Sequence, residues 1–300
     1  MKKKLSTILI IATIFFFLGG YLWLNWDELS QYQWDINIGG LINSYVILLF
    51  YFVIAVYIWQ RLLGEIGAKL KLGESFRIWF SSQLGKYIPG KVWASLGRIY
   101  LCQQVGISKR ISLTSIIFEY GLITVSAFIF GMPLLIFWTD KEIVNRFLPI
   151  CYLIPVALLM LHPKIFEKIA NFILIKFKKN PIALNFSYIR MLGFVVFYVF
   201  AWIIMGLAFY YFINSIYVID FTYYPVLAGI LALSILAGFL CFFVPAGLGV
   251  REGVLTGLLS IYLPLEIAIV IAIGSRIWIT LGELTGVGLA EISNLIKRRI

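Results

Sequence analysis

The stretch VPAGLGVREG (Val244–Gly253) interrupts one of the longest apolar parts of the chain. It places a proline, three glycines and the adjacent pair Arg251–Glu252 between two segments rich in lipid-soluble residues. A continuous membrane-spanning helix requires none of these, and a charge at its centre costs at least about 2.5–3.5 kcal/mol. We therefore expect a broken helix over about residues 244–263, with polar groups held at the break.

The composition of the whole chain is that of a membrane protein. Of its 300 residues, 62% are hydrophobic and only 13% are charged, whereas soluble domains have roughly 45–50% apolar and about 25% charged residues. Because helices satisfy their own backbone in lipid, we predict an all-α polytopic membrane protein. Residues 1–300 are expected to form a single integral membrane domain.

About twenty apolar residues are needed for a helix to cross a bilayer. The first candidate follows Lys2–Lys4 and is interpreted as a retained span, because its apolar part is longer than that of a signal peptide. We predict about eight transmembrane helices: Leu5–Leu24, Leu41–Leu63, Ser112–Trp138, Phe147–Leu161, Met191–Ile213, Pro225–Val244, Gly249–Leu263 and Leu265–Ala290.

The charges orient these spans. Lys and Arg gather before the first span, in residues 61–110 and 164–190, and at the C-terminal end, while the alternate loops are mostly acidic. The positive-inside rule then predicts a multi-pass protein of the cell membrane with both termini cytoplasmic. The same bias explains the net charge of +11, so we expect no nucleic-acid partner.

Two further segments do not cross the membrane in this prediction. Residues 76–100 lie between basic loops and are too apolar for a solvated loop, which favours a re-entrant hairpin turning near Pro89-Gly90. The alternative is an amphipathic helix lying on the inner surface. A basic amphipathic stretch over about 163–180 is expected to form a cytosolic surface helix.

YIPGK (Tyr87–Lys91) and VPAGLGVR (Val244–Arg251) share a pattern of an apolar approach, Pro, Gly and a cation. Paired Pro/Gly interruptions in two halves of a transporter indicate the substrate site, since broken helices offer free N–H groups to anions. We predict that a lipid headgroup contacts the following residues: Lys86, Pro89, Gly90, Lys91, Arg98, Pro245, Gly247, Gly249, Arg251 and Arg276.

Three carboxylates, Glu119, Glu252 and Glu283, lie in or beside apolar runs. Buried charges pair with one another or face a cavity, so these carboxylates are expected to pair with the cations or to carry protons. The alternative is that the pairs only fix helix register. GxxxG spacings at Gly249–Gly253–Gly257 and Gly282–Gly286 suggest close helix packing.

The segment GKYIPGKVWASLGR (Gly85–Arg98), Glu119, VPAGLGVREG and Arg276 together resemble the lysylphosphatidylglycerol synthase transmembrane family, also described as flippase-like membrane proteins. The likeness covers nearly the whole chain, and the block from Pro245 to Glu252 is its most specific part. Members commonly have Gly where this chain has Ala246, a change that keeps a small residue.

The resemblance implies a lipid translocase that handles an anionic phospholipid or a polyprenyl-linked lipid, with a link to cell-envelope or surface-polysaccharide biosynthesis. The expected partners are such a lipid, the cytoplasmic membrane, and envelope glycan enzymes or a second copy of the chain. The soluble synthase domain of two-part members is not expected here, nor is aminoacyl transfer, a cofactor or a metal. The alternatives are a membrane-embedded lipid or glycan transferase and a non-catalytic scaffold for such enzymes.

Overall fold

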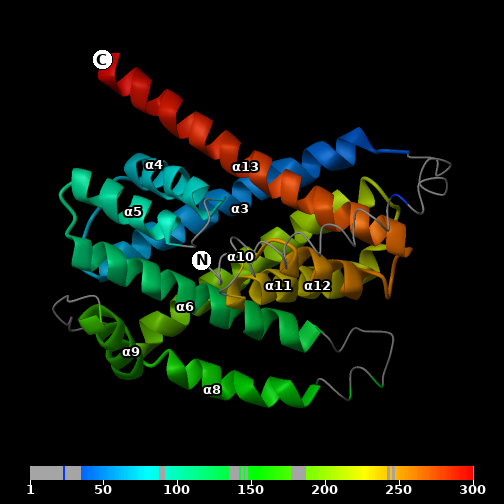
Figure 1. The fold of residues 1–300 in the computed structure, drawn as a ribbon, viewed down its shortest axis with the longest axis horizontal. Coiled ribbons are helices and arrows are strands. Elements are labelled where there is room, and N and C mark those ends of the chain that lie inside the picture. The colour runs from blue at the N-terminus through cyan, green and yellow to red at the C-terminus, as the bar shows by residue number, and fades with distance from the viewer. Residues whose placement is uncertain are drawn as a thin grey trace.

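The computed structural model describes residues 35–87, 92–134, 148–176, 187–241 and 247–299, together with Trp23, Glu142, Asn145 and Val244 (Figure 1). These residues form helices and connecting turns, without a strand among them. The predicted span Leu5–Leu24 and the site residues Pro89, Gly90, Lys91 and Pro245 lie outside the described residues.

Five described helices are long and apolar enough to cross a membrane. They are α3 (Ile38–Glu65), α6 (Lys109–Leu134), α10 (Tyr188–Asn214), α11 (Tyr224–Leu240) and α13 (Leu265–Arg299). They correspond to the second, third, fifth, sixth and eighth predicted spans. The prediction of an all-α polytopic membrane protein is therefore confirmed.

The remaining elements are short. They are α4 (Leu72–Gln83), η1 (Leu84–Tyr87), α5 (Trp93–Gln104), η3 (Leu148–Tyr152), α8 (Leu153–Met160), α9 (Pro163–Lys176), η4 (Phe221–Tyr223) and α12 (Val250–Leu259). With ten residues, α12 is about 15 Å long at 1.5 Å per residue, half of an apolar core of about 30 Å. The predicted span 249–263 thus contains a half-length helix, and the span 147–161 contains η3 and α8.

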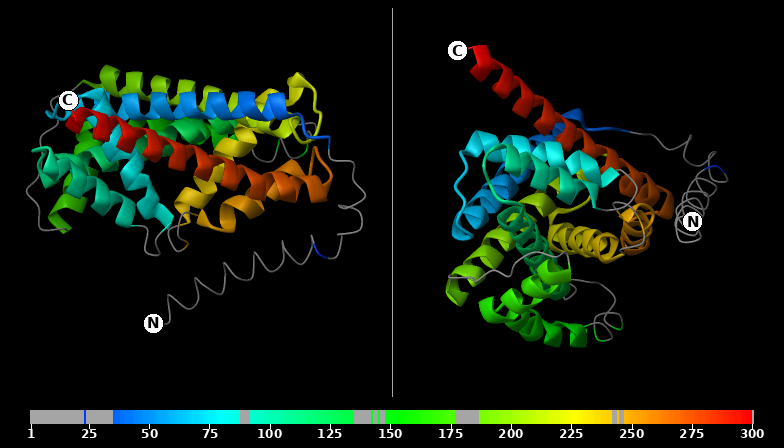
Figure 2. Two further views of the ribbon diagram at one scale, coloured as in Figure 1. Left: turned by 90° about the horizontal axis from the view of Figure 1, so that it is seen from above. Right: turned by 60° about the vertical axis from the view of Figure 1, so that its left-hand side comes forward.

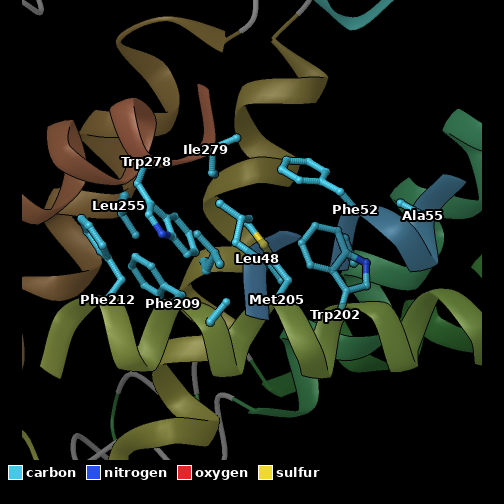
Figure 3. Close-up of a cluster of buried hydrophobic side chains, with 14 of the residues drawn as sticks. Leu48, Phe52, Ala55, Trp202, Met205, Phe209, Phe212, Leu255, Trp278 and Ile279 are labelled. Atoms are coloured by element: carbon cyan, nitrogen blue, oxygen red, sulfur yellow. The ribbon is translucent and has the colours of Figure 1, made fainter. Parts of the chain in front are cut away.

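The core lies where α3, α10, α11, α12 and α13 meet. Figure 3 shows Phe52 of α3 beside Trp202 and Met205 of α10, with Phe212 close to Trp278 of α13. The rings of Phe212 and Trp278 are stacked, with centroids 5.1 Å apart. The stacked pair holds α13 against α10.

The outer faces of the long helices are apolar as well. On α3 the exposed large side chains recur every three or four residues, as on one side of a helix: Ile42, Val46, Phe50, Val53 and Tyr57. A soluble helix would place charges there. Exposed apolar stripes on a bundle with a filled core are the pattern of helices facing lipid.

Glycines bring α13 close to its neighbours, as the second GxxxG spacing suggests. A Cβ on Gly282 would lie 2.9 Å from Leu48 and Phe52 of α3, and one on Gly286 would lie 2.1 Å from Phe80 of α4. The first spacing has no such role, because Gly253 and Gly257 have open space around them.

Two short elements lie on the same side of the layer formed by α3 and α10 (Figure 2). One is the helical hairpin of α4 and α5, which packs against α3, α6 and α13; the other is α12, which packs against α11 and α13. The helix α9 occupies part of the predicted surface segment 163–180. That the hairpin enters the membrane and that α9 lies on its surface stay predictions.

Candidate functional site

The long helix α13 carries two charged site residues, Arg276 and Glu283. Seven residues separate them, which is about two helical turns or 10.5 Å of rise, so their side chains share one face. The apolar part of α13 runs over Leu265–Ile292. Arg276 and Glu283 therefore lie on either side of its midpoint.

Arg276 binds the second interrupted segment. Its Nη1 lies 2.7 Å from Oε1 of Glu252, in the first turn of α12; the glutamate is buried, with 1% exposed, and the arginine is partly buried, with 15% exposed. The other carboxylate oxygen of Glu252 accepts the backbone N–H of Gly249 at 2.6 Å. Glu252 thus caps the helix and holds the arginine at the same time, as negative charge at a helix N-terminus favours.

The glycines of this segment are required by its backbone. Gly247 and Gly249 have φ angles of +64° and +83°, a region that residues with a side chain rarely adopt. A Cβ on Gly247 would also lie 2.6 Å from the Cα of Gly238 in α11. Arg251 then donates to the Ser275 hydroxyl at 3.1 Å, which ties the start of α12 to α13 a second time.

Lys86 joins the first interrupted segment to the same face of α13. It lies in η1, directly after α4, and forms an ion pair with Glu283. The lysine side chain is 29% exposed and the glutamate only 4%. The hairpin is tight here, because a Cβ on Gly85 would lie 2.6 Å from the backbone nitrogen of Ala94 in α5.

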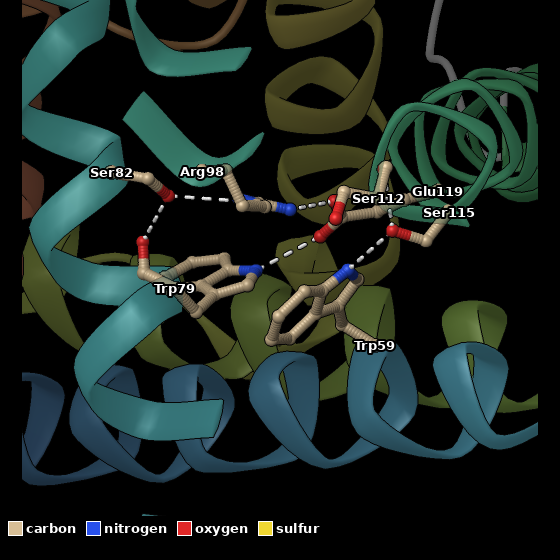
Figure 4. Close-up of polar contacts among 7 residues, drawn as sticks. All are labelled: Trp59, Trp79, Ser82, Arg98, Ser112, Ser115 and Glu119. Atoms are coloured by element: carbon tan, nitrogen blue, oxygen red, sulfur yellow. Dashed lines mark hydrogen bonds and ion pairs between the residues drawn. The ribbon is translucent and has the colours of Figure 1, made fainter. Parts of the chain in front are cut away.

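Arg98 and Glu119 form a third pair, inside the hairpin (Figure 4). Glu119 lies ten residues into α6, about 15 Å from its start, and each side chain is 2% exposed. Trp79 of α4 donates its indole N–H to Oε1 of Glu119 at 2.9 Å, and Arg98 donates Nε–H to Ser82 at 3.0 Å. Both arms of the hairpin are thereby attached to α6.

Aromatic rings close over the Arg98 guanidinium. Its Cζ lies 5.1 Å from the ring centroid of Trp59 in α3 and 5.7 Å from that of Trp79, distances typical of cation–π contacts. In this conformation Arg98 faces the protein interior. Headgroup binding by Arg98 stays a prediction.

Sequence reasoning missed the groups that support these charges. Trp79 and Ser82 are three residues apart and so share one face of a helix. This spacing is visible in the sequence. Trp59 and Ser275 gave no such signal. Tyr51 of α3, which interacts electrostatically with both Glu283 and Glu119, also went unnoticed.

The assembled groups have the chemistry that an anion site requires, and that they bind an anion stays a prediction. Guanidinium and ammonium groups form charge-assisted hydrogen bonds with phosphate oxygens, and Arg276, Arg251 and Lys86 converge on α13. No group of three or more His, Cys, Asp or Glu side chains that could hold a metal occurs in the described part of the chain.

A family model described as "Lysylphosphatidylglycerol synthase TM region" matches residues 6–282. This range contains both interrupted segments, the hairpin and the predicted site residues except Glu283, which follows it directly. No curated protein matches the chain.

Proposed function

The chain belongs to the lysylphosphatidylglycerol synthase TM region family, and from this premise we propose that it is a lipid translocase of the cytoplasmic membrane. Its substrate is an anionic phospholipid or a polyprenyl-phosphate-linked lipid, used in cell-envelope or surface-polysaccharide biosynthesis. Both termini are cytoplasmic. The family supports lipid handling by a multi-pass membrane protein, and the site supports a phosphate-bearing headgroup.

One observation carries the proposal. The residues next to the two Pro/Gly interruptions, whose prolines are 156 positions apart in the sequence, reach one face of α13 through the pairs Arg276–Glu252 and Lys86–Glu283. Structural stability alone gives a membrane protein no reason to place four charges there, because ionised groups in the bilayer are costly. A site that must receive an anion gives such a reason.

The α4–α5 hairpin supports a location of this site within the membrane. On α5, Trp93, Leu96 and Tyr100 are exposed, whereas Arg98 is buried. This is the reverse of a soluble amphipathic helix. It suits a helix whose outer face meets lipid and whose inner face lines a polar interior, as a re-entrant hairpin would.

The carboxylates then have a defined role. In the absence of lipid, Glu252 and Glu283 hold Arg276 and Lys86 in place and compensate their charge. An arriving phosphate competes with these carboxylates for the cations. The headgroup exchanges its hydration for fixed charges, which lowers the cost of its passage through the apolar layer.

Leaflet exchange in vesicles tests the proposal. The purified protein is reconstituted in phosphatidylcholine vesicles that contain fluorescent phosphatidylglycerol or a labelled polyprenyl phosphate, and a membrane-impermeant quencher reports the outer leaflet. Arg276→Ala is expected to slow exchange by about 10-fold or more, since a hydrogen bond to a charged group contributes roughly 1.5–3 kcal/mol. Arg190→Ala is the matched control, because Arg190 forms an exposed pair with Glu65.

The outcomes separate the alternatives. Exchange no faster than in protein-free vesicles, for every anionic lipid tried, contradicts translocation. Formation of a new lipid product would instead support the membrane-embedded transferase. Reduced assembly of envelope enzymes by Arg276→Ala, with lipid distribution unchanged, would support the scaffold.

A further inference from the structure

We propose that Glu283 is the proton-carrying group of the site, and that Lys86 moves between Glu283 and the lipid phosphate. The inference rests on the proposed function and adds its energy coupling: one proton accompanies each anionic headgroup. Three carboxylates were candidates from the sequence, and their surroundings differ in a way that separates them.

Glu252 is held as an anion from both sides. One oxygen pairs with the Arg276 guanidinium and the other accepts the Gly249 N–H at the positive end of α12. A guanidinium keeps its proton throughout the accessible pH range. Protonation of Glu252 would break both contacts and uncap the helix.

Glu119 is held as firmly. Arg98 pairs with one oxygen and the Trp79 indole donates to the other. The guanidinium lies against Trp59 and is fixed by Ser82, so it cannot move away without opening the hairpin. This pair attaches the hairpin to α6 and is not a site for cyclic protonation.

Glu283 differs because its cation can move. Lys86 is an ammonium on a flexible four-carbon chain, it lies at the end of the hairpin arm in η1, and its side chain is 29% exposed. The carboxylate is 4% exposed. If Lys86 moves to a phosphate, the buried carboxylate loses this ion pair, and proton uptake is a low-cost way to compensate for the loss.

The groups facing Glu283 from the neighbouring helices allow this exchange. From α3, Tyr51 lies within electrostatic range of Glu283, and Tyr45 bonds Thr285, two residues further along α13, at 2.7 Å. From α4, the apolar ring of Phe80 lies against α13 at Gly286.

Two other charges of the described site form ion pairs of their own. On α13 itself Arg276 is paired with Glu252 of α12, and beyond Tyr51 the charge of Glu119 is compensated by Arg98. From α10, the apolar ring of Phe212 stacks on Trp278 of α13.

Over one transport cycle, the lipid and one proton cross the membrane together. The phosphate monoanion enters and pairs with the Lys86 ammonium, while hydronium on the same side gives its proton to the Glu283 carboxylate. On the other side the lipid leaves, Glu283 returns the proton to water, and Lys86 pairs with Glu283 again. The lipid carries one negative and the proton one positive charge, so the net charge transferred is zero.

The test uses the full-length protein in phosphatidylcholine vesicles containing fluorescent phosphatidylglycerol. Net inward lipid movement is measured without a gradient, and again with the outside about one pH unit more acidic. With one proton per lipid, this gradient can drive up to about a tenfold difference in lipid distribution. Membrane potential imposed with a potassium ionophore is expected to have no effect.

Variants test whether Glu283 is responsible for the response to the pH gradient. Glu283→Gln is expected to reduce the ratio of rates with and without the gradient to about 1, whatever its absolute rate, since a neutral amide binds no proton in this range. Glu65→Gln is the control, because Glu65 forms the exposed pair with Arg190, and it should keep the wild-type ratio. A wild-type ratio in Glu283→Gln would overturn the assignment.

A second readout covers the case in which Glu283→Gln fails to fold. A pH-sensitive dye in the lumen of wild-type vesicles should register about one proton per lipid moved. Wild-type protein that moves lipid without protons and without response to the gradient overturns this inference and leaves the proposed function standing. Wild-type protein that moves no lipid under any condition overturns the proposed function itself.

Discussion

Trp79 and Arg98 bind the same carboxylate from opposite arms of the hairpin. The indole N–H of Trp79 reaches one oxygen of Glu119, and the Arg98 guanidinium pairs with the other (Figure 4). A single residue of α6 therefore holds α4 and α5 together. Because all three groups are buried, the loss of one leaves the others without compensation.

Arg98→Ala is expected to lower the free energy of unfolding by about 3–5 kcal/mol, since it leaves the Glu119 carboxylate buried and uncompensated. Unfolding in detergent micelles by denaturant or heat measures the loss. The double variant Arg98→Ala/Glu119→Ala should recover part of it. Arg190→Ala, in an exposed pair, should stay within about 0.5 kcal/mol of wild type. An equal loss of stability in Arg98→Ala and Arg190→Ala would contradict the role of the buried pair in holding the hairpin on α6.

Gly85 provides a second test of the hairpin. A Cβ at this position would come within 2.6–2.8 Å of the backbone of Trp93 and Ala94, so Gly85→Ala must separate the two arms. We expect a loss of about 1–3 kcal/mol and faster proteolysis of the hairpin. Gly97→Ala is the matched control in the same hairpin, because nothing lies within 4 Å of its Cβ position; in a helix this change should be neutral or stabilising by up to about 1 kcal/mol.

The sequence indicated which charged residues lie in apolar runs, but it could not show how they pair. Prolines, glycines and charges in apolar runs are locally visible, and they indicated both interrupted segments. Pairing depends on the path of the chain: Lys86 and Glu283 are 197 residues apart. Without the topology, no local rule could decide whether Lys86 or Arg98 belonged to Glu119.

Hydropathy alone could not show where the helix in the segment 249–263 ends. Tyr262 and Leu263 are apolar, yet they form a turn after α12, where the backbone N–H groups of both bond to the carbonyl of Leu259. Leu263 is 4% exposed because it packs against protein. Lipid and protein interiors select similar side chains, so composition alone cannot separate a half-length helix from a span.

Gly247 tests the second interruption. Its φ of +64° and its contact with Gly238 both exclude a side chain, so Gly247→Ala should displace the start of α12 and weaken the cap that Glu252 forms there. We expect a loss of about 1–3 kcal/mol in unfolding free energy. Gly253→Ala, in open space on α12, should be neutral or stabilising; equal effects of the two changes would show that the break tolerates a side chain.

The two hydrogen-bonded pairs Arg276–Glu252 and Arg190–Glu65 separate the effect of burial from that of distance. Their N–O distances are similar, 2.7 and 2.9 Å, but the first pair is 15% and 1% exposed and the second 61% and 31%. Double-mutant cycles with Gln at each position should give a coupling energy of about 1.5–3 kcal/mol for the buried pair and about 0–1 kcal/mol for the exposed pair. Added salt should reduce only the second value, because buried charges are poorly screened. Equal coupling energies in both cycles would mean that water reaches Glu252, and that the proposed anion site on α13 is as solvated as the protein surface.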